Sequence, residues 1–163
     1  MTSGEPEYEL SVVVPAFNEA VRISEPLHRI DRHLRARGLT AEILVIDDGS
    51  TDGTADVVRR VAADLATPVQ VISYAPNRGK CHAVKRGMAA ARARAVLMTD
   101  ADLSTPIEAL DRLLPALRDG TQVVIGSRRM EVRPSRCTSR WSASGWAGCS
   151  PSWHAFSGCG CPT

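Results

Sequence analysis

The sequence predicts an α/β fold in which a mostly parallel sheet carries helices on both faces. Two observations predict it. Between residues 10 and 129, short β-branched apolar runs alternate with segments of helical periodicity, and Pro, Gly and Asp mark the turns between them. A chain of 163 residues is long enough for one domain with a substantial core. We expect a flexible N-terminus over residues 1–9, one folded domain over 10–130 and an atypical tail over 131–163.

The first half of the domain predicts three strands and two helices. Apolar runs at 10–14, 42–46 and 69–72 have the composition of buried strands. A helix follows Ser24, which suits an N-cap, and Gly38 ends it. After the turn at 47–54, a second helix buries Val57, Val58, Val61 and Leu65.

The second half predicts two more helices and two more strands. An Ala-rich helix over 83–93 should turn its basic residues to water (Lys85, Arg86 and Arg92, with Arg94 just beyond), and a strand follows at 95–98. A helix over 106–117 begins with the spacing of a capping box: Thr105 as N-cap, Pro106 at the first position and Glu108 at the third. A last strand is expected at 122–126.

The segment from residue 131 to the end has a different composition. It contains no Val, Ile or Leu after Val132, yet it holds all three Trp and four of the five Cys. Such a segment can bury little aliphatic surface, so we expect it to be disordered. Because the change is abrupt, we hypothesise that a reading-frame shift has replaced the native C-terminal part.

Charge and cysteine content exclude several classes of protein. The net charge of +2 is small, which gives no reason to expect nucleic acid as a partner. No apolar stretch approaches the roughly 18–20 residues that span a bilayer, and the polar N-terminus is unlike a secretory signal. A cytoplasmic protein is therefore expected, with peripheral contact at the inner face of a membrane left open. The five cysteines lack zinc-site or disulfide spacing and are predicted to have no functional role.

Asp100 and Asp102 directly follow the apolar run at 95–98. Side chains two residues apart along a strand point to the same side, and the carboxyl ends of parallel strands form the ligand-binding edge of such folds. Carboxylate oxygens are the ligands that Mg²⁺ and Mn²⁺ prefer, often together with substrate phosphates. The alternative is an ordinary acidic turn.

Four further groups are expected at the same edge. Phe17 and Glu19 follow the first strand, Asp48 the second, the basic turn 77–80 the third, and Arg128 the last. Asp48 could accept from the imide N–H of a base, the turn before a helix could bind a diphosphate, and a guanidinium could clamp a phosphate. Each alone could be ordinary turn chemistry, but their convergence predicts a ligand site.

Five motifs, in order, resemble those of family 2 glycosyltransferases of the GT-A fold. They are Ser11-Val-Val-Val-Pro-Ala-Phe-Asn-Glu19, Val45-Ile-Asp-Asp-Gly-Ser-Thr-Asp-Gly-Thr54, Asn77-Arg-Gly-Lys80, Asp100-Ala-Asp-Leu-Ser-Thr-Pro106 and Gly126-Ser-Arg-Arg129. Within the family, the Leu-Ser-Thr-Pro continuation is most similar to the dolichyl-phosphate β-glucosyltransferase branch. The resemblance covers residues 10 to 129 and implies a nucleotide-diphospho-sugar transferase sandwich that is incomplete at its C-terminal end.

The resemblance also implies roles for individual residues. Asp102 matches the metal ligand, for Mg²⁺ or Mn²⁺, and Arg128 matches the arginine that meets a phosphate. Asp100, Asp102 and Arg128 would be the catalytic residues. The residues that would bind the nucleotide sugar are Pro15, Phe17 and Glu19 for the nucleoside, Ile46 and Asp48 for the base, Lys80 for the diphosphate, and Asp100 and Ala101 for ribose and diphosphate.

The activity implied is the inverting transfer of glucose from UDP-glucose to a dolichyl or polyprenyl phosphate. Two alternatives stay open: a GDP-mannose-dependent polyprenyl-phosphate mannosyltransferase, and a truncated, inactive nucleotide-binding domain. Cys81 departs from the family, which usually has glycine there. If this position requires a positive φ, Cys81 introduces strain. The second departure is the tail, where the family pattern is not recognisable after Arg129.

Overall fold

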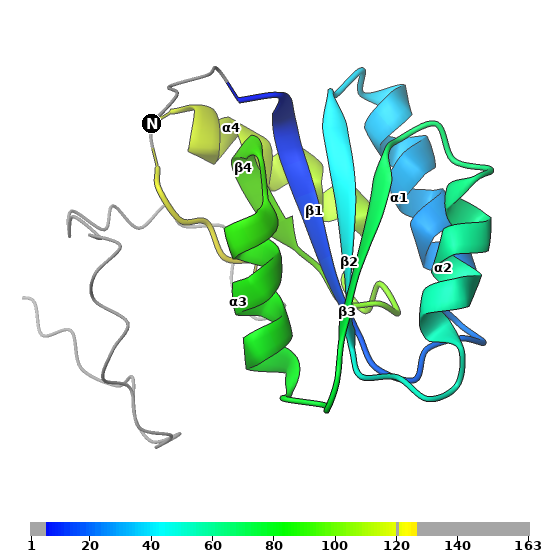
Figure 1. Cartoon of the computed structure of the whole chain (residues 1–163). Helices are drawn as coiled ribbons and strands as arrows, with labels where there is room; N and C mark the ends of the chain where they lie inside the picture. Colours follow the sequence, from blue (N-terminus) through cyan, green and yellow to red (C-terminus); the bar gives the residue numbers. More distant parts are fainter. Residues whose placement is uncertain (1–5, 120, 127–163) are drawn as a thin grey trace, which may run out of the picture.

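A computed structural model describes residues 6–119 and 121–126 (Figure 1). Strands and helices alternate along the chain. The elements are β1 (Tyr8–Ala16), α1 (Ser24–Ala36), β2 (Ala41–Asp48), α2 (Thr54–Ala62), β3 (Val69–Tyr74), α3 (Lys80–Ala90), β4 (Ala93–Met98), a 3-10 turn η1 (Ile107–Ala109) and α4 (Leu110–Arg118). The predicted α/β class with a parallel sheet is confirmed.

The four strands form one sheet in the order β3-β2-β1-β4, and every neighbouring pair is parallel. In the register, Val12 of β1 lies between Ile43 of β2 and Leu97 of β4. Each of the eight residues of the central strand β2 is buried. Its middle is apolar, as a strand covered on both faces requires, and its buried acids Glu42, Asp47 and Asp48 each accept hydrogen bonds.

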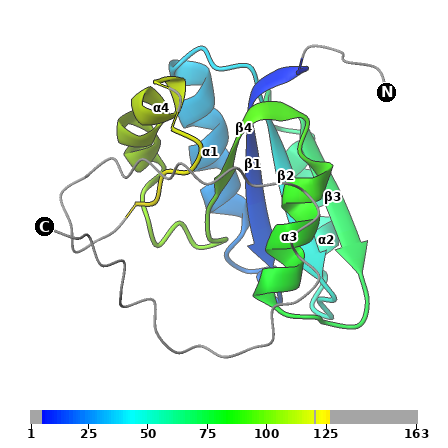
Figure 2. The same ribbon diagram turned by 90° about the vertical axis from the view of Figure 1, so that its left-hand side faces the viewer.

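Helices cover both faces of the sheet. Alternate residues of β1, including Val12 and Val14, face a core that α1, α2 and α4 share. Val13 faces the opposite way, into a smaller cluster under α3. Figure 2 shows α4 beside α1, with α3 on the other side of the sheet.

Helix α3 approaches the sheet closely at Gly87. A Cβ atom at this position would lie 2.3 Å from Cγ1 of Val13 and 3.0 Å from Cγ1 of Ile46. No real Cβ tolerates such a contact without movement of the neighbours. Glycine therefore sets the spacing between α3 and the sheet.

The strand predicted at 122–126 is not formed, and Val123 and Ile125 are 60% and 81% exposed. Connection handedness gives a physical reason. The crossovers β1–α1–β2 and β3–α3–β4 move in opposite directions with their helices on opposite faces, so both are right-handed. Because α4 lies on the α1 face, a parallel strand on the open side of β4 would require a left-handed crossover, which parallel sheets almost never contain.

Two predicted helix caps are also wrong. The N-cap of α1 is Ile23, and Ser24 lies inside the helix. The preceding turn already bonds the N–H groups of Arg22 and Ile23 to the Glu19 carbonyl, so the helical path starts before the serine. The capping box at Thr105 is not formed, because Pro106 has an extended ψ of 139° and only a 3-10 turn follows.

Helix α3 is shifted relative to its prediction and ends at Ala90. Arg92 therefore lies outside the helix, where its backbone N–H donates to the Glu42 carboxylate at 2.9 Å and its guanidinium donates at 2.9 and 3.2 Å. Glu42 is only 2% exposed and also accepts from the Ser11 hydroxyl at 2.7 Å. The Arg92 side chain is half exposed, as expected, but it lies outside the helix and the buried carboxylate determines its position.

Candidate functional site

The loops that follow the four strands meet at the carboxyl edge of the sheet, at its lower end in Figure 1. In a parallel sheet all strand ends of one kind lie at the same edge, which explains why segments far apart in sequence converge here. Nine of the ten predicted site residues lie in these loops or at the ends of the elements that flank them. The tenth, Arg128, lies outside the described residues.

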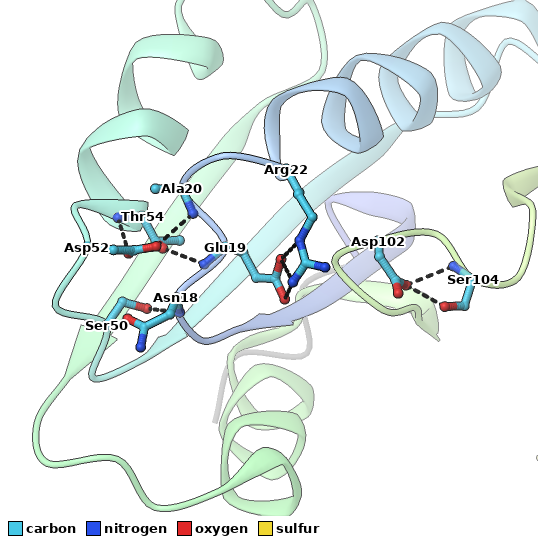
Figure 3. A network of polar contacts seen from close by, with 9 residues as sticks. All are labelled: Asn18, Glu19, Ala20, Arg22, Ser50, Asp52, Thr54, Asp102 and Ser104. Carbon is cyan, nitrogen blue, oxygen red and sulfur yellow. Dashed lines mark hydrogen bonds and ion pairs between the residues drawn. The ribbon is translucent and has the colours of Figure 1, made fainter.

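Two of these loops are held together by hydrogen bonds from Asn18 (Figure 3). The backbone N–H of Asn18 donates to Oγ of Ser50 at 2.9 Å, and its side-chain Oδ1 accepts from the N–H of Thr51 at 3.0 Å. Asn18 has a φ of 53°, a left-handed conformation that asparagine tolerates better than most residues. The Asn of the first motif is therefore a structural link between the loops after β1 and β2.

Asp52 makes the second connection between the same loops. Its carboxylate accepts from the N–H of Ala20 and the N–H of Thr54, both at 3.0 Å, and from the Thr54 hydroxyl. Oγ1 of Thr54 in turn accepts from the N–H of Glu19 at 2.9 Å. The Thr54 hydroxyl holds the pKa of Asp52 below its ordinary value. Sequence reasoning missed Asn18, Ser50, Asp52 and Thr54 as a network, because Ser, Thr and Asp are common in any turn.

The Glu19 side chain forms an ion pair with Arg22 in the turn that precedes α1. Its carboxylate accepts from Nε and Nη2 of Arg22 at 3.0 and 3.1 Å. Arg22 also lies on the side of Glu19 nearer to Asp102 (Figure 3). A guanidinium thus stands between two carboxylates at the sheet edge and balances part of their charge.

Asp48, the last residue of β2, is 3% exposed, and its Oδ1 accepts from the N–H of Arg78 at 2.7 Å. This bond joins β2 to the turn before α3. Gly49 makes the close approach possible, since a Cβ there would lie 2.8 Å from the backbone N of Asn77. The structure therefore places Asp48 at the predicted edge but covers it with the loop before α3.

Lys80 is the first residue of α3, and its ammonium group forms an ion pair with Asp100. The pair joins the turn after β3 to the loop after β4. The Lys80 and Asp100 side chains are 58% and 43% exposed, so the charges are accessible from solvent. A cation beside a helix N-terminus is the electrostatic environment that an anionic group requires.

Asp102 interacts with different groups. Its Oδ1 accepts from the N–H of Ser104 at 2.9 Å and from the Ser104 hydroxyl at 2.7 Å. The hydroxyl and then the N–H hold the pKa of Asp102 below its ordinary value, so the carboxylate is ionised at neutral pH. Strand β4 ends at Met98, and Leu103 has a φ of 49°. Asp100 and Asp102 therefore lie in a turn, and the strand alternation that predicted a shared direction does not apply to them.

The remaining predicted residues differ in their accessibility. Phe17 is 48% exposed at the edge, whereas Ile46 is fully buried beneath α3 and Ala101 is 6% exposed within the core. Pro15 lies in β1 opposite Ile46. A ligand at this edge could contact the Phe17 ring directly. Ile46 and Ala101 are buried and can influence a ligand only through the residues that pack over them.

The acids at the edge fit one type of metal site. Among residues 6–119 and 121–126, no three His, Cys, Asp or Glu side chains gather closely enough to form a complete metal site. Mg²⁺ and related cations are commonly held by only one or two carboxylates, with waters and substrate phosphates as the other ligands. Asp102, exposed and ionised, is suited to that arrangement.

Cys81 shows none of the strain that the sequence suggested. It lies in the first turn of α3, where φ is negative, and its side chain is exposed. The positive φ occurs two residues earlier, at Gly79 (88°). The Cys81 substitution is therefore compatible with the backbone.

Comparison with known proteins agrees with this geometry. The family model described as glycosyl transferase family 2 matches residues 11–142. A dolichol-phosphate mannosyltransferase of Pyrococcus furiosus is 36% identical over 120 residues, which cover 74% of this chain and 33% of that protein. A dolichyl-phosphate beta-glucosyltransferase of Drosophila melanogaster is 37% identical over 137 residues, which cover 76% of this chain and 41% of that protein. The chain thus spans between a third and two fifths of the length of these relatives.

Solved structures show the same fold. A mannosyltransferase from Pyrobaculum calidifontis, solved with GDP-Man and Mn²⁺, is 36% identical with a TM-score of 0.50, over 61% of this chain and 30% of that one. The S. aureus TarS structure (residues 1–349) has a TM-score of 0.55 at 23% identity. The match covers 68% of this chain and 32% of that one, and it supports the fold alone. Within the described ranges, no helix combines the length and apolar character that crossing a bilayer requires. The chain belongs to glycosyltransferase family 2 and has its GT-A fold.

Proposed function

We propose that this chain forms the donor-binding part of an inverting glycosyltransferase that moves glucose from UDP-glucose to a dolichyl or polyprenyl phosphate. The observation that carries the proposal is the edge where Lys80, Asp100 and Asp102 lie beside the loop that covers Asp48. These groups supply a cation, carboxylates and a base acceptor at one sheet edge. Relatives named as dolichyl-phosphate beta-glucosyltransferases support the choice of substrates.

The donor would lie across the strand ends. Phe17, half exposed, would pack against the nucleoside, and Asp48 would accept the imide N–H of uracil once the loop at Arg78 moves aside. The diphosphate would lie near Lys80 and the start of α3, where the helix dipole favours negative charge. Binding would then exchange the Lys80–Asp100 ion pair for a contact between Lys80 and phosphate.

Asp102 would hold a divalent cation at the diphosphate, as would suit an exposed, ionised carboxylate. When bound, such a cation supplies positive charge that offsets the charge developing on the leaving nucleoside diphosphate. Lys80 would contribute to the same effect from the protein side. Mn²⁺ in the GDP-Man complex of the Pyrobaculum calidifontis relative supports a divalent cation.

The acceptor phosphate would attack the anomeric carbon on the face opposite the diphosphate, which inverts the configuration. A phosphate with a second pKa of about 6 is already largely anionic at neutral pH. No strong general base is therefore required. Arg128, predicted from the sequence to meet a phosphate, is proposed to orient this group.

Two relatives favour a second candidate. The Pyrococcus furiosus and Pyrobaculum calidifontis proteins are mannosyltransferases, and the latter was solved with GDP-Man. A GDP-mannose-dependent transfer to polyprenyl phosphate uses the same edge, because Asp48 can accept from guanine N1–H as readily as from uracil N3–H. Binding of a nucleotide without transfer is the third possibility, and the transfer assay below distinguishes it.

Calorimetric titration of the full chain with UDP-glucose and GDP-mannose, each with and without Mn²⁺, tests the proposal. We expect tighter binding of UDP-glucose, dependence on Mn²⁺, and loss of that dependence in Asp102→Asn. Asp64→Asn is the matched control, since Asp64 is an exposed acid after α2, away from the strand ends. Preference for GDP-mannose would support the mannosyl alternative, and no binding of either donor would overturn the donor site itself.

Transfer is measured separately, with radiolabelled donor and a short polyprenyl phosphate. Formation of a lipid-linked glucose with inverted configuration is the expected product. Donor binding without any product would favour the inactive nucleotide-binding domain.

A further inference from the structure

Tyr74 ends β3 and lies directly opposite Asp48, the last residue of β2, in the parallel register. Paired residues of adjacent strands point to the same face, so both side chains lie on the side of the sheet that α3 covers. The Tyr74 hydroxyl oxygen is buried and has no hydrogen-bond partner within the described part of the chain. Buried hydroxyls are almost always bonded, and an exception requires an explanation.

Two side chains of α3 pack against the Tyr74 ring. The His82 ring meets it edge to face, with centroids 5.1 Å apart and planes at 77°. The Arg86 guanidinium lies 5.6 Å from the ring centroid. Both residues belong to α3, whose distance from the sheet is set at Gly87. The hydroxyl therefore has a fixed position at the strand end.

The Asp48 carboxylate is an electrostatic neighbour of this hydroxyl, and its Oδ1 accepts from the N–H of Arg78 at 2.7 Å. Burial, and then the neighbouring Asp48 carboxylate, raise the pKa of Tyr74 to about 12. The phenol thus stays protonated at neutral pH and can act as a donor. Because Asp48 is paired with Tyr74 across the two strands, its carboxylate is the acceptor that this hydroxyl can reach when the side chain turns.

We propose that Tyr74 is a positioning residue for Asp48: its hydroxyl donates to the carboxylate when Asp48 turns to accept the N–H of a donor base. This inference rests on the proposed function, because it assigns Asp48 to the base. In the structure the Arg78 N–H bonds to Asp48. When the loop that carries Arg78 moves, the Tyr74 hydroxyl takes the place of this N–H as a donor. The buried hydroxyl then gains a hydrogen-bond partner, so Tyr74 favours the base-binding orientation of the carboxylate.

A double-mutant cycle on nucleotide affinity tests this, using Tyr74→Phe, Asp48→Ala and the double variant in the full chain, titrated with UDP and GDP in the presence of Mn²⁺. Tyr74→Phe keeps the ring contacts with His82 and Arg86 and removes only the hydroxyl. We expect it to raise the Kd of the preferred nucleotide roughly ten- to a hundredfold, as loss of a hydrogen bond to a charged group does. In the Asp48→Ala background, which has no acceptor, the same change should have almost no effect.

A second arm varies the ligand and needs no change at Asp48. A nucleotide methylated on the ring nitrogen that faces Asp48 (N3 of uracil, N1 of guanine) lacks the donated N–H. Wild type and Tyr74→Phe should bind it equally. Tyr8→Phe is the matched control, since Tyr8 lies at the opposite end of β1 against Arg92 and should leave all affinities unchanged.

Stability separates positioning from a structural role. Because the hydroxyl has no hydrogen-bond partner in the structure, Tyr74→Phe should leave the unfolding midpoint unchanged or raise it while weakening nucleotide binding. An unchanged Kd, or an effect that persists in Asp48→Ala and with the methylated nucleotide, would overturn the inference alone. Failure of wild type to bind either nucleotide would instead overturn the proposed function and, with it, the role of Tyr74.

Discussion

The Lys80 ammonium group forms an ion pair with the Asp100 carboxylate, although the two residues are 20 positions apart in the sequence. Lys80 begins α3 and Asp100 follows β4, so the pair closes the carboxyl edge of the sheet on the α3 side. Exposed pairs of this kind contribute little to stability, typically below about 1 kcal/mol. A pair that costs little to open is well placed to release its lysine to an incoming anion.

Lys80→Met should therefore weaken the binding of a nucleoside diphosphate while leaving the protein folded. We expect a rise in the Kd for UDP or GDP of about tenfold, as for the loss of one charge-assisted contact to phosphate. Calorimetry with the diphosphate and with the corresponding nucleoside measures it, and only the diphosphate should be affected. Lys85→Met, one turn later on the exposed side of α3, is the control. An equal loss for the nucleoside would show that Lys80 does not meet the diphosphate.

Asp52 should make stability depend on acidity. Hydrogen bonds from Thr54 lower its pKa in the folded chain, so its contribution is fully present above the unfolded pKa of about 3.9 and is lost as the pH falls through the folded pKa. Urea unfolding at pH 5 and pH 3 should show Asp52→Ala less stable than wild type at pH 5, with a smaller difference at pH 3. Asp64→Ala should show neither effect. A difference that grows on acidification would contradict the assignment.

Glu42 should be among the most sensitive positions for stability. Glu42→Ala leaves the buried Ser11 hydroxyl and the Arg92 amide without their acceptor. We expect the free energy of unfolding to fall by about 2–3 kcal/mol, less than for a fully buried pair because Arg92 is half exposed. Glu108→Ala, which removes an exposed carboxylate 3.7 Å from Arg29, should change it by less than about 0.5 kcal/mol. Chemical denaturation compares the two; equal effects would show that the Glu42 network contributes nothing.

Gly87→Ala should destabilise the fold through overpacking. The added methyl would lie 2.3 Å from Val13 Cγ1, so α3 must move away from the sheet. The expected cost is about 1–3 kcal/mol, measured by chemical denaturation. Because Lys80 belongs to α3, the displacement of this helix should also lower the affinity for nucleotide. Met88→Ala, at the next and half-exposed position, should have little effect on either quantity.

The strand and helix order could be predicted because each element carries its own periodic signal. Val12, Val13 and Val14 form a continuous apolar run, and Leu27, Ile30 and Leu34 recur at helical spacing. Helix ends were less predictable. Ser24 has the composition of a cap, but the turn at Glu19 already starts the helical path, so that Ile23 is the N-cap and its carbonyl accepts from the N–H of Leu27. The identity of Ser24 does not reveal that a backbone hydrogen bond earlier in the chain starts the helix before it.

The strand expected at 122–126 shows a second limit. Val123, Val124 and Ile125 have strand composition. Whether such a run joins a sheet depends on which face the preceding helix covers, and α4 covers the α1 face. Connection handedness then excludes a parallel place on the open side of β4. The composition of a strand is a local property, whereas its place in the sheet depends on the topology of the preceding elements.

The sequence by itself determined the parallel α/β class, the family, and the edge at which Phe17, Asp48, Lys80, Asp100 and Asp102 would lie, because these depend on element order and local motifs. Only the tertiary structure decided which polar groups meet. Asn18 bonds Ser50, Asp52 bonds Ala20, Lys80 pairs with Asp100, and Tyr74 lies unbonded beside Asp48. The physical reason is that hydrogen bonds act over about 3 Å, and the chain segments that satisfy them are brought together only when the sheet forms.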